Sequence, residues 1–196
     1  MDTTLERELG RIEDAYLAGL GDPPALVAFA RQARGEALAR EDLERAERVR
    51  ATIGATIDRL GPILRQHGWP ESWPGDHRLR WRATAIVHAV LHSAPVEFHR
   101  ICLEHVRAAF EAGHAHPRDL AVLTDLVLRG EGRPQRYGML VTGWPDVAPE
   151  PIEDPEGVDE RRASLGLPSL AEHLRERRAN AELQEREHQK LREQFP

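Results

Sequence analysis

Cysteine and lysine are almost missing from this chain of 196 residues. Cys102 is the single cysteine, which excludes an intrachain disulfide and a cysteine-rich zinc site and favours a small core residue. Lys190 is the single lysine, so arginine supplies nearly all the positive charge. Together with abundant alanine, that bias suggests a GC-rich bacterial genome more than it suggests a function.

Long hydrophobic runs are also missing. No stretch approaches the roughly 20 apolar residues that cross a bilayer, so we expect no membrane contact. The first residues lack the basic start and apolar run of a secretory signal, and the cytoplasm is the expected location. A net charge of -6 argues against general nucleic-acid binding, which needs a basic face to neutralise phosphates.

The residues that are present favour helices, with 40% hydrophobic and 31% charged positions. Apolar residues recur at steps of three and four, broken by glycine and proline. The pattern predicts a mainly α fold, a compact domain of about six to seven helices. With the charged C-terminal helix counted in addition, the expected helices cover residues 3–20, 23–35, 40–66, 78–93, 95–113, 117–130, 159–165 and 169–194.

One helix, over residues 40–66, should be the longest of the N-terminal half, with Pro62 kinking or restarting its last turns. At most a short β-hairpin is expected near residues 135–148. Ser169 and Glu172 have the spacing of a capping box. We expect residues 1–174 to form one domain and residues 175–196 to form a charged helical tail, either exposed or partly ordered.

Most of the ten histidines lie in the middle of the chain. His88 and His92 are four residues apart on one predicted helix, a spacing that lets two imidazoles share a metal ion. A third ligand, such as His99, would have to come from the next helix. The ordinary alternative is a histidine on a helix surface or in a structural hydrogen bond. We therefore expect no cofactor and keep a His88–His92 metal site as a minor alternative.

Asp125 lies among apolar residues on a predicted helix. A buried carboxylate must be paired or carry a raised pKa, which makes Asp125 a candidate general base or a group that orients His92. The structural alternative is an ion pair with one of the arginines. Arg161 and Arg162 could bind a carboxylate or phosphate, although arginines before a helix are more often solvated or paired with neighbours.

Tyr137 stands before Gly138, where the missing side chain lets a backbone or ligand come close. Its phenol could donate a hydrogen bond to a developing oxyanion, or it could simply pack. Gln135 could fix a ligand amide or hold a loop. Trp69 and Trp81 could line a pocket or anchor loops.

Several short motifs, in this order, carry a resemblance to a known family: Gly68-Trp69-Pro70, Leu91-His92, Leu123-Thr124-Asp125, Gln135-Arg136-Tyr137-Gly138, Pro151-Ile152-Glu153-Asp154, and Arg161 to Leu167. The chain resembles, from about residue 42 to 174, an uncharacterised bacterial family catalogued as a domain of unknown function. That family usually shows Gly-Trp-Pro, Gln-His, Asp-Arg and Tyr-Gly-Thr-Gln. Here Leu91, Leu126 and Met139-Leu140 replace polar members of those motifs. The resemblance implies no reaction, but it marks the same residues and a less polar pocket.

The combined prediction is a small enzyme that performs acid/base chemistry without a redox cofactor on an apolar molecule, as in specialised metabolism, by cyclisation, dehydration, isomerisation or hydrolysis. His92 would act as general acid or base, Asp125 would orient it or share its proton, and Tyr137 would donate to an oxyanion. The predicted substrate-binding residues are Gln135, Trp69, Trp81, Met139, Leu91 and Leu126. The alternative is a binding or scaffold protein in which this polar cluster braces the core, and a homodimer is open in either case.

Overall fold

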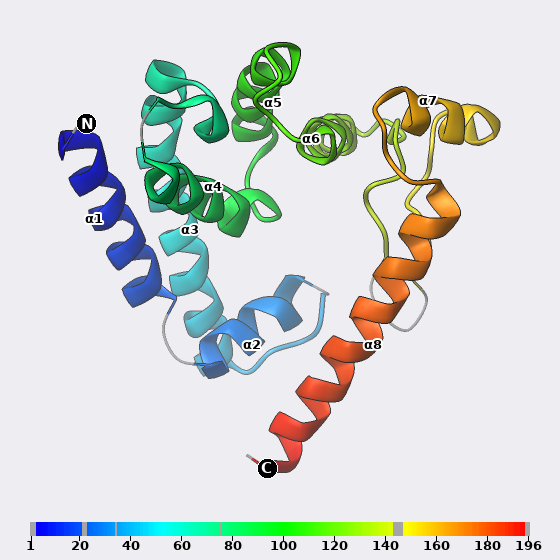
Figure 1. The fold of residues 1–196 in the computed structure, drawn as a ribbon. Helices are drawn as coiled ribbons and strands as arrows, with labels where there is room; N and C mark the ends of the chain where they lie inside the picture. The colour runs from blue at the N-terminus through cyan, green and yellow to red at the C-terminus, as the bar shows by residue number, and fades with distance from the viewer. Residues whose placement is uncertain (1–2, 21–22, 34, 75, 143–146, 195–196) are drawn as a thin grey trace. The chain divides into compact units, whose positions relative to one another are not determined.

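The computed structural model describes residues 3–20, 23–33, 35–74, 76–142 and 147–194 (Figure 1). Within them lie eight α-helices and no β-strand, which confirms the mainly α fold. The helices are α1 (Thr3–Gly19), α2 (Pro23–Ala33), α3 (Arg40–His67), α4 (His77–Leu91), α5 (Val96–Glu111), α6 (Pro117–Gly130), α7 (Val158–Ser164) and α8 (Leu170–Gln194). Two single-turn 3₁₀ helices, η1 (Pro70–Ser72) and η2 (Pro155–Gly157), precede α4 and α7.

The chain forms two compact units, Met1–His105 and Val106–Pro196. The predicted boundary at residue 174 falls inside α8, a continuous helix from Leu170. The division into a domain of residues 1–174 and a tail of residues 175–196 stays a prediction.

In the first unit, α3 contacts α1, α2 and α4, and α1 runs alongside it in Figure 1. Helix α3 presents a stripe of buried residues at helical spacing: Ala46, Val49, Ile53, Thr56, Leu60, Gly61 and Leu64. Leu43, expected at the start of this stripe, is exposed. The helix continues through Pro62, which is exposed, to His67.

Cys102 is buried on α5, as the sequence predicts for a core cysteine. Burial raises the pKa of its thiol to about 12, because the thiolate is poorly solvated there. Among the described helices, none combines the length and the hydropathy needed to cross a bilayer.

The second unit holds α6, α7, α8 and the long irregular segment between α6 and α7. The described part of this segment makes two isolated bridges, Gln135 with Ile152 in parallel and Val141 with Pro149 in antiparallel orientation, which is within the expected limit of at most a short hairpin. Part of the expected hairpin, residues 143–146, lies outside the described residues. The bridges bring residues 135–141, the loop that follows α6, beside residues 149–152.

The expected capping box begins α8. The Ser169 backbone N–H and hydroxyl both donate to Glu172 Oε2, at 2.9 and 2.7 Å, and the Glu172 N–H donates to the Ser169 hydroxyl at 3.3 Å. These hydrogen bonds lower the pKa of Glu172, because they favour its ionised form. The Asp159 carboxylate accepts the Leu170 N–H at 2.7 Å and ties α7 to the same helix end.

Candidate functional site

Asp125 is the centre of the polar structure in the second unit. It lies on α6, where an apolar pattern buries Leu123, Leu126 and the carboxylate itself, which is 0% exposed. Asp125 Oδ1 accepts the backbone N–H groups of Arg136 at 2.7 Å and Tyr137 at 2.9 Å, and Oδ2 accepts that of Met139 at 2.8 Å. One carboxylate therefore holds three amides of the loop that follows α6.

Burial raises the pKa of Asp125 above its ordinary value, and the three backbone hydrogen bonds and the charge of Arg162 oppose that rise. An ionised carboxylate only accepts hydrogen bonds, and here each oxygen already accepts at least one from a fixed backbone donor. Asp125 is thus built into the loop as an anchor.

Gln135 extends the same framework. Its Nε2 donates to the carbonyls of Leu140 at 2.9 Å and Glu150 at 2.8 Å, and its Oε1 accepts the Leu140 N–H at 2.9 Å. Both amide hydrogens are therefore used in holding loop segments together. The side chain is 2% exposed. The sequence left open whether Gln135 fixes a ligand amide or holds a loop, and this geometry matches the second role.

A buried arginine also holds the loop, through a main-chain carbonyl. Arg162, on α7, donates from Nη1 to the carbonyl of Tyr137 at 2.6 Å and from Nε to that of Pro168 at 2.7 Å. Burial lowers its pKa, and the carboxylates of Asp159 and Asp125 oppose the change. Its partner Arg161 bonds the carbonyls of Glu153 and Arg136, so both arginines are engaged within the unit.

His173, on α8, is the other buried titratable group here. It is 2% exposed, and its Nε2 lies 3.4 Å from the carbonyl oxygen of Met139. Burial and the neighbouring charge of Arg162 lower its pKa, because both disfavour the imidazolium. Its neutral form thus completes the packing around Met139.

Gly138 has a conformation that the loop requires. Its φ is +67°, and a Cβ there would lie 2.8 Å from Leu170 Cδ1 and 3.0 Å from Ile152 Cδ1. Glycine alone fits both the positive φ and the close approach. The sequence predicts a close approach to the backbone at Gly138. The groups that approach it are the side chains of Leu170, on α8, and Ile152.

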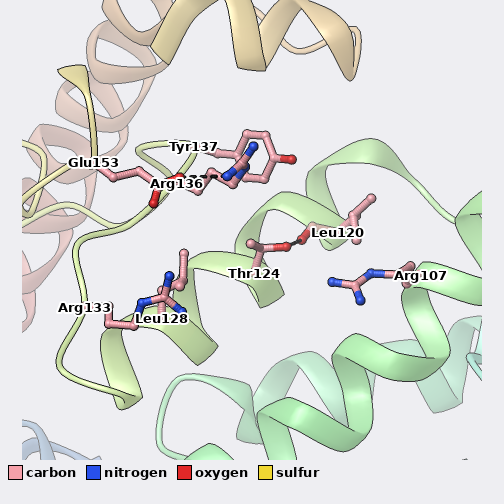
Figure 2. Close-up of a pocket in the computed structure, with 8 residues that line it drawn as sticks. All are labelled: Arg107, Leu120, Thr124, Leu128, Arg133, Arg136, Tyr137 and Glu153. Atoms are coloured by element: carbon pink, nitrogen blue, oxygen red, sulfur yellow. Dashed lines mark hydrogen bonds and ion pairs between the residues drawn. The ribbon is translucent and has the colours of Figure 1, made fainter. Parts of the chain in front are cut away.

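A cavity of about 340 Å³ lies on the outer side of this loop, entirely within the second unit. Figure 2 shows its lining: Arg107, Leu120, Thr124, Leu128, Arg133, Arg136, Tyr137 and Glu153. Arg107 extends from α5 toward α6, and the Tyr137 hydroxyl points away from its own loop (Figure 2). Three guanidinium groups and one carboxylate therefore share a small space with two leucines and a phenol.

Two of the three arginines in the cavity wall have carboxylate partners. Arg136 Nη1 lies 2.9 Å from Glu153 Oε1, and Arg133 Nη1 lies 3.4 Å from Glu131 Oε2. Arg107 makes no hydrogen bond or ion pair with any residue that the structure describes. The cavity wall thus carries one positive charge that no described carboxylate compensates.

Of the predicted catalytic residues, Tyr137 lines this cavity, Asp125 lies buried beneath the loop and His92 belongs to the first unit. His92 is exposed at the C-cap of α4, and His88 is exposed one turn earlier, its ring 6.3 Å from that of Trp69. Across the described ranges, no group of three or more His, Cys, Asp or Glu side chains could hold a metal ion. The structure thus gives the His88–His92 alternative no third ligand within those ranges.

None of the predicted substrate-binding residues belongs to the lining of the cavity. Trp69 and Leu91 are buried in the first unit, and Trp81 is 67% exposed there. In the second unit, Leu126 and Met139 are buried, as is Gln135. Because none of them lines the cavity, their assignment as substrate-binding residues stays a prediction.

Sequence reasoning missed the arginines of the cavity wall. The motif that carries Gln135 and Tyr137 lies in the right loop, and Tyr137 lines the cavity, but Arg136 between them does so as well. No local pattern singles out Arg136, because one of its neighbours is buried and the other lines the cavity. Nothing local in the sequence connects Arg107 with Glu153.

Comparison with known proteins gives a family but no function. Residues 37–184 match the model of a family of unknown function (DUF6624). No curated protein and no solved structure matches the chain. The match confirms the resemblance to an uncharacterised domain-of-unknown-function family, while the short motifs and the bacterial origin stay predictions.

Proposed function

Because the chain belongs to DUF6624, a family of unknown function, its activity must be inferred from its own residues, and we propose that the second unit binds a small anionic organic molecule. The site is the cavity walled by Arg107, Arg136 and Tyr137. The observation that carries the proposal is the gathering of three guanidinium groups around one cavity in a chain whose net charge is -6. Arginine forms forked hydrogen bonds to carboxylate and phosphate oxygens, which makes an anion the matching ligand.

The size and the apolar part of the cavity favour an organic molecule over a bare inorganic ion. A volume of about 340 Å³ lies at the lower end of the roughly 300–1,000 Å³ typical of ligand pockets. Leu120, Leu128 and the ring of Tyr137 provide apolar surface for a hydrocarbon or aromatic part. The apolar molecule expected from the sequence thus becomes an amphipathic one with an anionic end.

The framework under the loop supports the same proposal. Asp125 holds the N–H of Tyr137 and Arg162 holds its carbonyl, so the main chain that carries the phenol is fixed before any ligand arrives. A main chain that is already ordered loses little conformational freedom on binding, which favours affinity.

Acid/base catalysis with His92, Asp125 and Tyr137 stays a second proposal. The observation in its favour is that the Tyr137 phenol, held on a fixed main chain, points into a cavity of ligand size. A His92→Ala variant that folds but loses activity on a substrate, once one is found, would support it. An unchanged activity would contradict it.

The cytoplasmic location, the role in specialised metabolism and the homodimer also stay proposals. Light scattering of the purified chain tests the homodimer.

Three probe molecules of one shape test the anion proposal: benzoate, phenyl phosphate and the neutral benzyl alcohol. A ligand of this size gains about 4 kcal/mol, which corresponds to a Kd on the order of 1 mM, within reach of an NMR titration. We expect benzoate to shift backbone amide signals of the loop around Tyr137 and benzyl alcohol to leave them in place.

Two arginine variants complete the test. Arg107→Gln should weaken benzoate binding about tenfold, because it removes a charge-assisted hydrogen bond. Arg129→Gln makes the same change of charge at an arginine that pairs with Glu150 and lies outside the cavity lining, so it should have little effect. Equal binding of benzoate and benzyl alcohol, or an equal loss in both variants, would overturn the proposal.

A further inference from the structure

Resting on the anion pocket proposed above, we propose that Glu153 is its specificity-determining residue and makes the pocket select ligands with a single negative charge. The chemical class is an organic carboxylate, preferred over a dianion such as a phosphate monoester.

The first step is that the main chains of Glu153 and Arg136 are both held. The Glu153 N–H donates to the carbonyl of Gln135 at 2.8 Å, and its own carbonyl accepts from Arg161 Nη2 at 2.6 Å. The Arg136 N–H donates to Asp125 at 2.7 Å, and its carbonyl accepts from Arg161 Nε at 3.0 Å. The framework therefore fixes the spacing of the two main-chain positions from which these side chains extend.

The second step is the compensation of charge. Within this fixed spacing, Arg136 Nη1 and Glu153 Oε1 are 2.9 Å apart, so an incoming anion meets a nearly neutral pair at that wall. Glu131 compensates Arg133 in the same way, though from outside the cavity lining. Arg107 is left as the guanidinium without a carboxylate partner in the described part of the chain. One uncompensated positive charge matches one negative charge.

The third step is the scaling of the effect with ligand charge. The Coulomb energy between Glu153 and a bound anion is proportional to the charge of that anion. Neutralising Glu153 should therefore raise the affinity for a monoanion by some factor and the affinity for a dianion by about the square of it. Because the side chain is partly exposed and water screens it, we expect a factor of about three for benzoate and about ten for phenyl phosphate.

The test measures both affinities at pH 8, where a phosphate monoester with a second pKa of about 6 is a dianion. The wild-type chain should bind benzoate more tightly than phenyl phosphate. Glu153→Gln keeps every main-chain hydrogen bond and should shift the ratio of the two dissociation constants about threefold toward phenyl phosphate. Glu150→Gln is the matched control, since it removes one carboxylate from an ion pair with Arg129 outside the cavity lining and should leave the ratio unchanged.

A double variant separates charge compensation from any other effect of the substitution. Arg136→Gln alone leaves Glu153 uncompensated and should weaken both probes, phenyl phosphate the more. Arg136→Gln with Glu153→Gln removes the pair together and should restore a ratio near that of the wild-type chain. A wild-type preference for phenyl phosphate, or an unchanged ratio in Glu153→Gln while benzoate still binds, would overturn the role of Glu153 alone. If neither probe bound any of these proteins, the anion pocket itself would fall, and this inference with it.

Discussion

Asp125 and Arg162 hold the two ends of one residue, Tyr137. The carboxylate accepts the Tyr137 N–H at 2.9 Å, and the guanidinium donates to the Tyr137 carbonyl at 2.6 Å. Both side chains are buried and come from different helices, α6 and α7. Two buried side chains of opposite charge thus bind the same main-chain residue. That residue is Tyr137, whose side chain lines the cavity.

Asp125→Asn should destabilise the second unit by about 2–4 kcal/mol. The substitution places an amide N–H against a backbone N–H and removes one of the two carboxylates, Asp125 and Asp159, whose charges act on the buried Arg162. Urea unfolding followed by circular dichroism measures the change. Glu160→Gln, a carboxylate-to-amide change at an exposed residue of α7, is the control and should stay within about 0.5 kcal/mol. Equal stability of the two variants would show that Asp125 does not anchor the loop.

Gly138→Ala should cost more than the same substitution at Gly132. Both glycines have positive φ, +67° and +71°, so both variants carry the conformational cost of about 1 kcal/mol. At Gly138 the new methyl group also meets Leu170 and Ile152, whereas at Gly132 it meets nothing within 4 Å. We expect a further loss of about 1–2 kcal/mol at Gly138 by thermal or urea unfolding. A loss no larger than that of Gly132→Ala would contradict the tight packing at Gly138.

The pH dependence of stability should carry a contribution from His173. Its pKa in the folded chain is lowered by burial and Arg162, so the unfolded chain binds the proton first as the pH falls. Stability from this group is therefore complete above the ordinary histidine pKa of about 6.5 and declines as the pH falls below it toward the folded-state pKa. Urea midpoints between pH 7.5 and pH 5 should fall less in His173→Gln than in the wild-type chain. Identical slopes would show that His173 is not buried in its neutral form.

The helices could be predicted from the sequence because each carries its own local signal. Apolar spacing, Pro117 at a helix start and the Ser169–Glu172 capping box are set by neighbours in the chain. The cavity could not be predicted in the same way, since Arg107 and Glu153 come together through the fold of the loop and not through any spacing. Asp125 was found because a carboxylate among apolar residues is conspicuous, but its partners are backbone amides, which leave no mark in a sequence.

Tyr137→Phe removes the phenol hydroxyl and should keep the main-chain hydrogen bonds that hold residue 137. The hydroxyl makes no hydrogen bond to any residue that the structure describes, so its loss should change stability by less than about 0.5 kcal/mol. If the phenol donates to a ligand anion beside Arg107, benzoate binding should weaken about threefold to tenfold, the range of one neutral or charge-assisted hydrogen bond. The NMR titration that measures this loss also shows whether the loop amides of the free variant keep their wild-type positions. Unchanged affinity with an intact loop would remove the phenol from the binding site and leave Arg107 and Arg136 as the groups that recognise the anion.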